Sequence, residues 1–91
     1  MIKGVGCGDT EALFEAQPVR RFAQFERAAR RKLEILNAAS SLQDLRVPPG
    51  NRLEALKGDR KGQYGIRING QWRICFKWND GAENVEIINY H

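Results

Sequence analysis

The chain has 91 residues, 42% of them hydrophobic and 29% charged, which is typical of one folded domain spanning residues 1–91. A domain this small supports one modest core, which excludes large catalytic lobes and a dinucleotide-binding fold. Fifteen Lys and Arg residues, ten of them Arg, oppose eleven acidic residues; the net charge of +4 is compatible with a nucleic-acid partner without establishing one.

The first forty residues are predicted to be mainly helical. Residues 2–5 could form a short edge strand, and the Asp-Thr pair at positions 9–10 is typical of the N-cap of a short helix over 11–15. From Pro18 to about residue 39, apolar residues recur at spacings of three and four, which predicts one long amphipathic helix. Its apolar stripe consists of Phe22, Phe25, Ala29, Leu33 and Leu36.

Charged residues on this long helix fall mostly outside the apolar stripe. They allow two interpretations, a solvated helix face, which is the commoner case, or a basic flank that contacts phosphate. These residues are Arg20, Arg27, Arg30, Arg31 and Glu34.

The middle of the chain is predicted to turn repeatedly. Ser41 and Asp44 have the spacing of a capping box, with Asp in place of the usual Glu, so a brief helical turn is expected there. The Pro-Pro-Gly sequence at 48–50 ends that turn. Residues 52–56 are expected to be extended, and residues 57–62 form a polar turn with three cations.

The last thirty residues predict an antiparallel meander. Asn69-Gly70 is typical of a two-residue type I′ hairpin turn, and residues 79–81 mark a second turn. Because side chains alternate between the faces of a strand, residues 72, 74 and 76 share the face that meets the helix. The same alternation places another set on the opposite face: Arg67, Arg73, Cys75, Lys77, Glu86, Ile88 and Tyr90, with His91 at its edge.

These elements predict an α+β fold. N-terminal helices would pack on one face of a twisted, mainly antiparallel sheet of about four to five strands, and the other face would be cationic. The chain contains no apolar run near the roughly 20 residues of a membrane span and no signal-peptide pattern, so we expect a cytoplasmic protein without a membrane partner. Cys7 and Cys75 lie far apart with only one histidine in the chain, which predicts two reduced thiols and no zinc site.

Three segments of the sequence carry a family resemblance. Residues 51–60 contain an L-x-G-x-R turn, residues 66–76 contain the strand Q-W-R-I-C-F, and residues 85–91 close with Tyr-His. Together they closely resemble plasmid-maintenance killer proteins, the HigB branch of the RelE/ParE toxin superfamily, over nearly the whole chain.

The resemblance implies a RelE-like, microbial-RNase-like fold and a toxin of a type II toxin–antitoxin system. The toxin would cleave mRNA in the ribosomal decoding site, by attack of the 2′-OH and without a metal or cofactor. It would act in the bacterial cytoplasm and be neutralised by a helix-turn-helix, HigA-like antitoxin. Operator DNA would be a partner only through that antitoxin.

The resemblance also implies a catalytic set, with two departures. Characterised members have a histidine where this chain has Glu54 and an acid where it has Asn89, while Lys57 and Arg73 match. An asparagine cannot act as an acid or base at ordinary pH. If Glu54 only pairs the neighbouring cations, the 2′-OH would be activated mainly by positioning, which predicts a slow enzyme. The catalytic candidates are Lys57, Arg73, Tyr90, His91, Glu54 and Asn89.

Each candidate has a chemical role in RNA cleavage. Arg73 and Lys57 would meet the charge of the phosphorane, and His91, with a reference pKa of about 6.5, would be the general acid. Tyr90 would stack on a base or hydrogen-bond the phosphate. Glu54 could accept a proton, or it could simply pair the neighbouring cations; both interpretations stay open.

Further cations would contact phosphates of mRNA or ribosomal RNA without reading sequence. These are Arg60, Lys61, Arg67 and Lys77. Two alternatives to the RNase remain: a non-catalytic ParE-like toxin that inhibits gyrase, and an RNA-binding module with a degenerate site.

Overall fold

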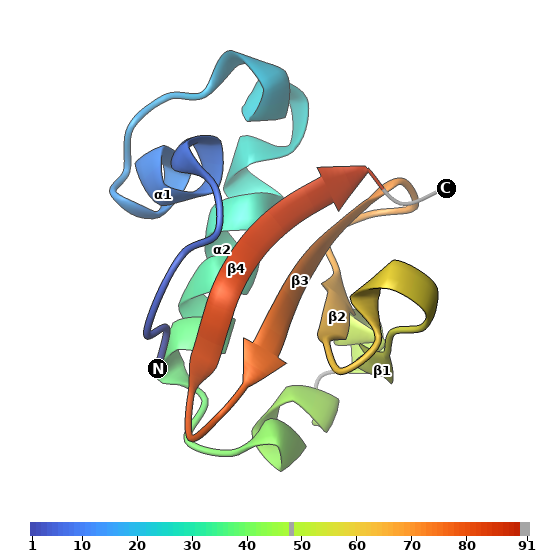
Figure 1. The fold of residues 1–91 in the computed structure, drawn as a ribbon. Helices are drawn as coiled ribbons and strands as arrows, with labels where there is room; N and C mark the ends of the chain where they lie inside the picture. Colours follow the sequence, from blue (N-terminus) through green and yellow to red (C-terminus); the bar gives the residue numbers. More distant parts are fainter. Residues whose placement is uncertain (48, 90–91) are drawn as a thin grey trace.

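The computed structural model describes residues 1–47 and 49–89, and it has two layers (Figure 1). One layer consists of helices, and the other is an antiparallel sheet of four strands in the order β1-β2-β3-β4. The α+β class and the packing of helices on one face of the sheet are confirmed. No helix in the described part of the chain is long and apolar enough to cross a membrane.

The N-terminal segment runs along the edge of the sheet. Residues 2–5 make two isolated parallel bridges, Ile2 to Ala82 and Val5 to Val85, so the predicted edge strand is present only in this minimal form. Helix α1 spans Gly8–Phe14 with Cys7 at its N-cap. The predicted cap at positions 9–10 is wrong, because the structure uses these side chains elsewhere: Asp9 pairs with Arg21, and the Thr10 hydroxyl accepts a hydrogen bond from Ile87.

The predicted long helix is divided into two helices. A 3₁₀ helix, η1, spans Arg20–Phe25, and the α-helix α2 spans Glu26–Ala38. In a 3₁₀ helix, residues three apart lie on the same side. This geometry brings the rings of Phe22 and Phe25 to within 5.9 and 4.8 Å of the Trp72 ring, between ring centroids.

Short turns connect α2 to the sheet. The capping box of Ser41 and Asp44 is confirmed at the start of η2, a 3₁₀ helix over Leu42–Arg46. The turn was predicted to end at residues 48–50, of which residue 48 lies outside the described part. In the structure η2 ends at Arg46, and η3 covers Pro49–Asn51. Of the predicted extended segment 52–56, only Glu54–Ala55 forms a strand, β1, and Arg52 has a φ of 46°. The polar turn contains η4 (Gly58–Arg60).

The C-terminal meander is confirmed as β2 (Tyr64–Arg67), β3 (Trp72–Trp78) and β4 (Ala82–Asn89). The first hairpin is not the predicted type I′ turn, since neither Asn69 nor Gly70 has the positive φ that such a turn requires. Instead Ile68 N–H donates to the carbonyl of Trp72, and the Asn69 carboxamide accepts hydrogen bonds from the backbone N–H groups of Gln71 and Trp72. The side chain of Asn69 thereby closes a longer loop.

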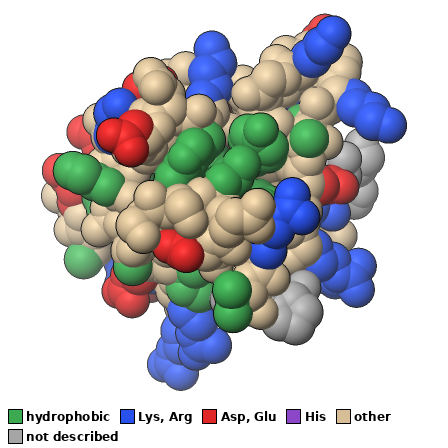
Figure 2. All heavy atoms as spheres, turned by 90° about the horizontal axis from the view of Figure 1, so that it is seen from below, with side chains coloured by type: hydrophobic (Ala, Val, Ile, Leu, Met, Phe, Trp, Pro, Cys, Tyr) green, Lys and Arg blue, Asp and Glu red, His purple; other side chains and the backbone are tan. Residues whose placement is uncertain are grey.

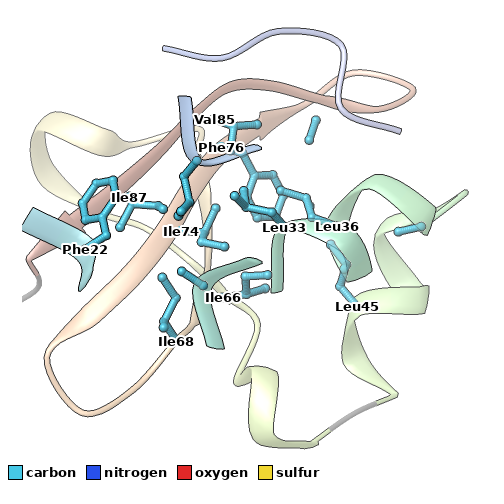
Figure 3. Packing of buried hydrophobic residues seen from close by; sticks show 14 of the residues in the cluster. Phe22, Leu33, Leu36, Leu45, Ile66, Ile68, Ile74, Phe76, Val85 and Ile87 are labelled. Atoms are coloured by element: carbon cyan, nitrogen blue, oxygen red, sulfur yellow. The ribbon is translucent and has the colours of Figure 1, made fainter. Parts of the chain in front are cut away.

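The core lies between α2 and the sheet (Figure 3). The sheet contributes Ile66, Ile74 and Phe76, and α2 contributes Leu33 and Leu36, all at most 1% exposed. The predicted apolar stripe and the predicted core face of β3 therefore meet as expected. The opposite face of the sheet is not covered by α2 and carries several of the predicted site residues.

Candidate functional site

The sheet face that points away from the helices carries a row of residues across all four strands. The strand register aligns Glu54 on β1 with Gly65 on β2, Cys75 on β3 and Glu86 on β4. Gly65 leaves little room for a side chain in this row, because a Cβ atom there would come within 3.3 Å of the Leu56 side chain. The row thus places one carboxylate on each side of a buried cysteine.

Arg73 lies two residues before Cys75 on β3 and points to the same face. Its Nη1 atom lies 2.9 Å from Oε1 of Glu54, and both atoms are shielded from solvent. The Arg73 side chain is only 17% exposed, whereas Glu54 is 42% exposed. Of the two interpretations of Glu54, the structure therefore contains the ion pair.

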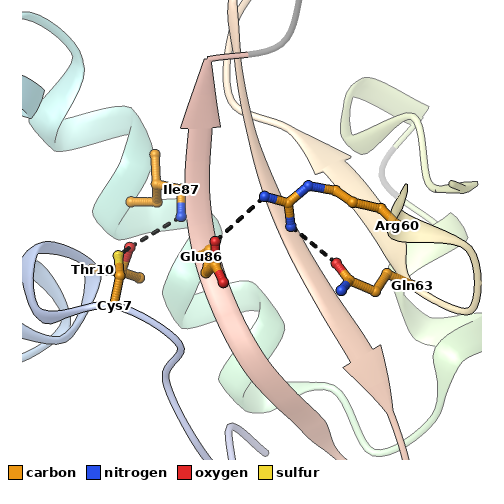
Figure 4. A network of polar contacts seen from close by, with 6 residues as sticks. All are labelled: Cys7, Thr10, Arg60, Gln63, Glu86 and Ile87. Atoms are coloured by element: carbon orange, nitrogen blue, oxygen red, sulfur yellow. Dashed lines mark hydrogen bonds and ion pairs between the residues drawn. The ribbon is translucent and has the colours of Figure 1, made fainter. Parts of the chain in front are cut away.

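A second ion pair closes the other side of the row (Figure 4). Arg60 reaches from the turn after β1 across β3, with Nη2 at 3.4 Å from the Glu86 carboxylate and Nη1 at 3.1 Å from the Gln63 carboxamide. The sheet face is therefore less cationic than predicted, because Arg60 and Arg73 each pair with a carboxylate. Arg60 also ties the 57–63 turn to β4.

Cys75 lies beneath these two pairs and is fully buried. Burial raises the pKa of its thiol, although the nearby Arg60 guanidinium acts in the opposite direction. A buried, protonated thiol is a poor nucleophile. We therefore assign Cys75 to packing rather than to chemistry.

A pocket of about 300 Å³ opens beside the Glu54–Arg73 pair. It is lined by Glu54, Ala55, Leu56, Lys57 and Arg60. Lys57 is exposed at this pocket, so its ammonium group can reach a bound anion. The wall of the pocket therefore contains the carboxylate of Glu54, the exposed ammonium of Lys57 and part of Arg60.

The other predicted site residues lie farther out. Lys61 and Lys77 are exposed, and Lys77 is aligned with Glu83 on β4. Arg67 is aligned with Arg73 and half-buried. Asn89 is aligned with Trp72, which places it in the core-facing series of β4 and not with Arg73. Tyr90 and His91 lie outside the described residues.

Two residues of this network had no predicted role. Alternation placed Glu86 on this face, but nothing in the sequence indicated its pairing with Arg60, which is 26 residues away. Gln63 follows a glycine in a polar turn and carries no periodic signal. In the described part of the chain, no group of three or more His, Cys, Asp or Glu side chains is arranged to hold a metal ion.

Comparisons with known proteins identify the family of this chain. Residues 13–91 match the family model described as RelE-like toxin of type II toxin–antitoxin system HigB. The chain is 54% identical over 69 residues to Toxin HigB-1 of Vibrio cholerae, covering 76% of this chain and 73% of the relative. It is 41% identical over 39 residues to Endoribonuclease HigB of Proteus vulgaris, covering 43% of this chain and 40% of that protein. An uncharacterised Haemophilus influenzae protein is 39% identical over 61 residues, covering 67% of this chain and 60% of its own length.

Proposed function

Because the chain belongs to the HigB-like family of RelE-like toxins of type II toxin–antitoxin systems, we propose that it is an endoribonuclease that cleaves mRNA in the ribosomal decoding site. The name of the Proteus vulgaris relative, an endoribonuclease, supports this activity. A type II toxin has an antitoxin partner, and we expect a HigA-like helix-turn-helix protein. The reaction would take place in the cytoplasm, where mRNA is translated.

The observation that carries the proposal is the Glu54–Arg73 pair beside a pocket that contains Lys57. The Arg73 guanidinium projects from a strand, so it is rigidly placed. A phosphodiester offers the same forked acceptor geometry as a carboxylate and can replace Glu54 on this guanidinium. Arg73 and Lys57 would then face the negative charge that develops on the phosphorane.

Displacement of Glu54 also supplies a proton acceptor. The released carboxylate can take the proton of the 2′-OH while the 2′-oxygen bonds to phosphorus and the bond to the 5′-oxygen breaks. The leaving oxygen needs a proton, for which we propose His91, and Tyr90 would stack on a base or hydrogen-bond the phosphate. Asn89 can take no part in proton transfer, and Glu54 is paired with Arg73 in the free protein, so we expect slow turnover. From the family resemblance we also expect no metal requirement.

The surrounding cations differ in whether they are exposed to solvent or already held by other side chains. Lys61 and Lys77 are exposed and can contact phosphates of the bound RNA directly. Arg67 extends the same surface beside Arg73. Arg60 can reach a phosphate only by giving up Glu86 or Gln63, so we assign it chiefly to holding the 57–63 turn.

The test is cleavage of a defined mRNA by the purified chain, with the mRNA free or bound to programmed ribosomes. We expect primer extension to detect cuts in the decoding-site codon only when ribosomes are present. Arg73→Ala should lower the cleavage rate at least about 100-fold, because one preorganised charge-stabilising donor is worth about 10²- to 10³-fold. Arg46→Ala, a change of an exposed arginine on η2, is the matched control and should cleave normally.

Intact mRNA on ribosomes at a large excess of folded protein would contradict the RNase proposal. Growth arrest without any mRNA cleavage would then point to a non-catalytic toxin, and supercoiling by gyrase would be measured next. Equal cleavage rates for Arg73→Ala and Arg46→Ala would mean that the reaction does not take place on this sheet face.

A further inference from the structure

Glu86 is a charged residue of the sheet face that has no part in the proposed reaction. It lies on β4 opposite Cys75, and its side chain is 32% exposed. Its carboxylate is 3.4 Å from Nη2 of Arg60, which belongs to the turn between β1 and β2. The Arg60 side chain therefore crosses β3 to reach it (Figure 4).

Glu86 is held in place because β4 is anchored on both sides of it. Just before it, the carbonyl of Val85 accepts a hydrogen bond from Gly6 N–H at 2.8 Å. Just after it, Ile87 N–H donates to the Thr10 hydroxyl at 3.0 Å. The side chain also packs against Gly6, where an added Cβ atom would lie 2.8 Å from its Cγ and Oε1 atoms. The carboxylate therefore projects from a part of the sheet with little freedom to move.

The turn over residues 57–63 has few attachments to the rest of the protein. Its two glycines, Gly58 and Gly62, have positive φ, and a Cβ atom at either would meet nothing within 4 Å. Within the described residues, the Arg60–Glu86 contact is the only ion pair or side-chain hydrogen bond that joins this turn to a strand or helix outside it. The position of the turn over the sheet therefore depends on this contact.

Arg60 connects the same contact to Lys57. Its backbone N–H donates to the Lys57 carbonyl at 3.3 Å, while its guanidinium contacts Glu86. Lys57 lines the pocket beside Glu54, and it is exposed there. A lysine carries its charge on a flexible chain, so the region that the ammonium can reach is set by where the backbone is held. Two successive contacts thus lead from β4 to this ammonium.

We propose that Glu86 is a positioning residue for RNA cleavage: through Arg60 it holds the 57–63 turn so that Lys57 faces the phosphate in the pocket. The inference rests on the proposed function, in which Lys57 meets the negative charge of the phosphorane. Such stabilisation depends on placement, since a displacement of about 1 Å can cost about 100-fold in rate. In this role Glu86 touches neither the RNA nor the reacting atoms.

A carboxylate beside Arg60 could instead serve only to neutralise it, and the two roles predict different kinetics. If Glu86 only masks a cation, its removal frees a guanidinium for RNA, so KM should fall while kcat stays the same. If Glu86 positions Lys57, its removal should lower kcat, and KM should not rise much because the freed guanidinium still attracts RNA. The separation of kcat from KM therefore distinguishes the two roles.

The test compares Glu86→Ala with Glu83→Ala in the ribosomal cleavage assay. Glu83 is the matched control, because it lies on the same strand, pairs with Lys3 at 3.3 Å and is 35% exposed. It lies near the start of β4, at the end of the molecule where Figure 2 shows apolar side chains gathered in the middle and most charged ones around the rim. We expect Glu86→Ala to lower kcat about tenfold without raising KM more than about twofold, and Glu83→Ala to cleave like the parent protein.

A double variant shows whether Glu86 acts through Lys57. Lys57→Ala removes the group that is positioned, so adding Glu86→Ala to it should slow cleavage no further. Losses that multiply in the double variant would overturn the proposal, as would an unchanged kcat in Glu86→Ala. Circular dichroism shows whether Glu86→Ala is folded. Glu86→Thr, which also removes the carboxylate and suits a strand, replaces it if it is not.

Hydrogen exchange separates this inference from the proposed function. The Gln63 amide donates a hydrogen bond within the turn, to the Arg60 carbonyl at 3.0 Å. We expect NMR to show that this amide exchanges faster in Glu86→Ala than in Glu83→Ala. If it does and the parent protein cleaves no mRNA, Glu86 holds the turn and the proposed function alone fails. If the parent protein cleaves and the two variants match in exchange and in kcat, the positioning role alone fails.

Discussion

Glu54 and Arg73 illustrate how one contact can serve both stability and chemistry. The 2.9 Å pair keeps a largely buried guanidinium neutralised in the free protein. Burying a charge is costly, so this pair offsets part of the cost of burying the guanidinium. In the proposed reaction, a phosphate that replaces Glu54 would neutralise the same guanidinium, and the displaced carboxylate would become available as a base.

Asp44 is a residue whose contribution to stability depends on pH. The backbone N–H and the hydroxyl of Ser40, followed by the backbone N–H of Ser41, hydrogen-bond its carboxylate and lower its pKa from the ordinary 3.8. A group with a lowered pKa stabilises the fold fully above its unfolded value, and the contribution is lost as pH falls through the folded value.

Asp44→Ala should therefore unfold more readily than the parent protein at pH 7. The difference should shrink progressively as the pH falls below about 4, because the carboxylate is protonated first in the unfolded chain and then, below its lowered pKa, in the folded protein as well. Urea unfolding at pH 7 and pH 3 measures it. Asp59→Ala, at an exposed aspartate on η4, is the control. A difference that is constant with pH would rule out the carboxylate as its source.

At the scale of elements, the N-terminal segment depends on a glycine in the β3–β4 turn. Gly81 has φ 146°, and a Cβ atom there would lie 2.9 Å from the carbonyl oxygen of Met1. That carbonyl accepts a hydrogen bond from Ala82 N–H, so it cannot move away freely. The turn and the bridge from Ile2 to Ala82 are therefore linked at one backbone position.

We expect Gly81→Ala to lower the free energy of unfolding by more than about 1 kcal/mol, because both its φ and its backbone contact oppose a side chain. Urea denaturation measures this loss. Gly50→Ala is the matched control, since a Cβ atom at Gly50 meets nothing within 4 Å. Equal stability of the two variants would show that the N-terminal bridges contribute little.

Helix η1 is a second case in which an element depends on its partner. Apolar spacing alone favoured a continuous helix through Phe22 and Phe25. The 3₁₀ geometry instead aligns both rings on Trp72, and the chain turns at Phe25, where φ is −129°, before α2 begins. Aromatic packing on the sheet therefore outweighs the preference for an uninterrupted α-helix.

At the scale of the whole molecule, one small core holds both layers together. Phe76 is fully buried, and its ring lies 6.3 Å from Tyr64 and 6.4 Å from Trp78, between centroids. Domains of this size are stable by only about 5–15 kcal/mol in total. A single large cavity in the core therefore removes a substantial part of the free energy of unfolding of the whole domain, including the strands that carry the site.

Phe76→Ala should cost about 3–5 kcal/mol, the usual loss for truncating a buried phenylalanine. Val47→Ala, at a position that is 77% exposed, should change stability by less than about 0.5 kcal/mol. Urea midpoints of the two variants, with cleavage measured in parallel, distinguish loss of fold from loss of chemistry. A loss below about 1 kcal/mol for Phe76→Ala would contradict the core described above.

The sequence alone determined the class of fold and the faces of its elements. Helical and strand periodicity depend on neighbours two to four residues apart, so they can be read locally, and they placed Arg73, Cys75 and Glu86 on one face. The capping box of Ser41 and Asp44 is equally local. The family motifs added the catalytic candidates, and the catalytic roles of all of them remain predictions.

Tertiary structure alone decided how those side chains are paired. Arg60 meets Glu86 across 26 residues, and Thr10 accepts a hydrogen bond from Ile87 across 77. It also decided the break at η1 and the loop closed by Asn69, where contacts with Trp72 replaced the locally preferred conformation. Such contacts depend on which segments the folded chain brings together, and no local pattern of residues contains that information.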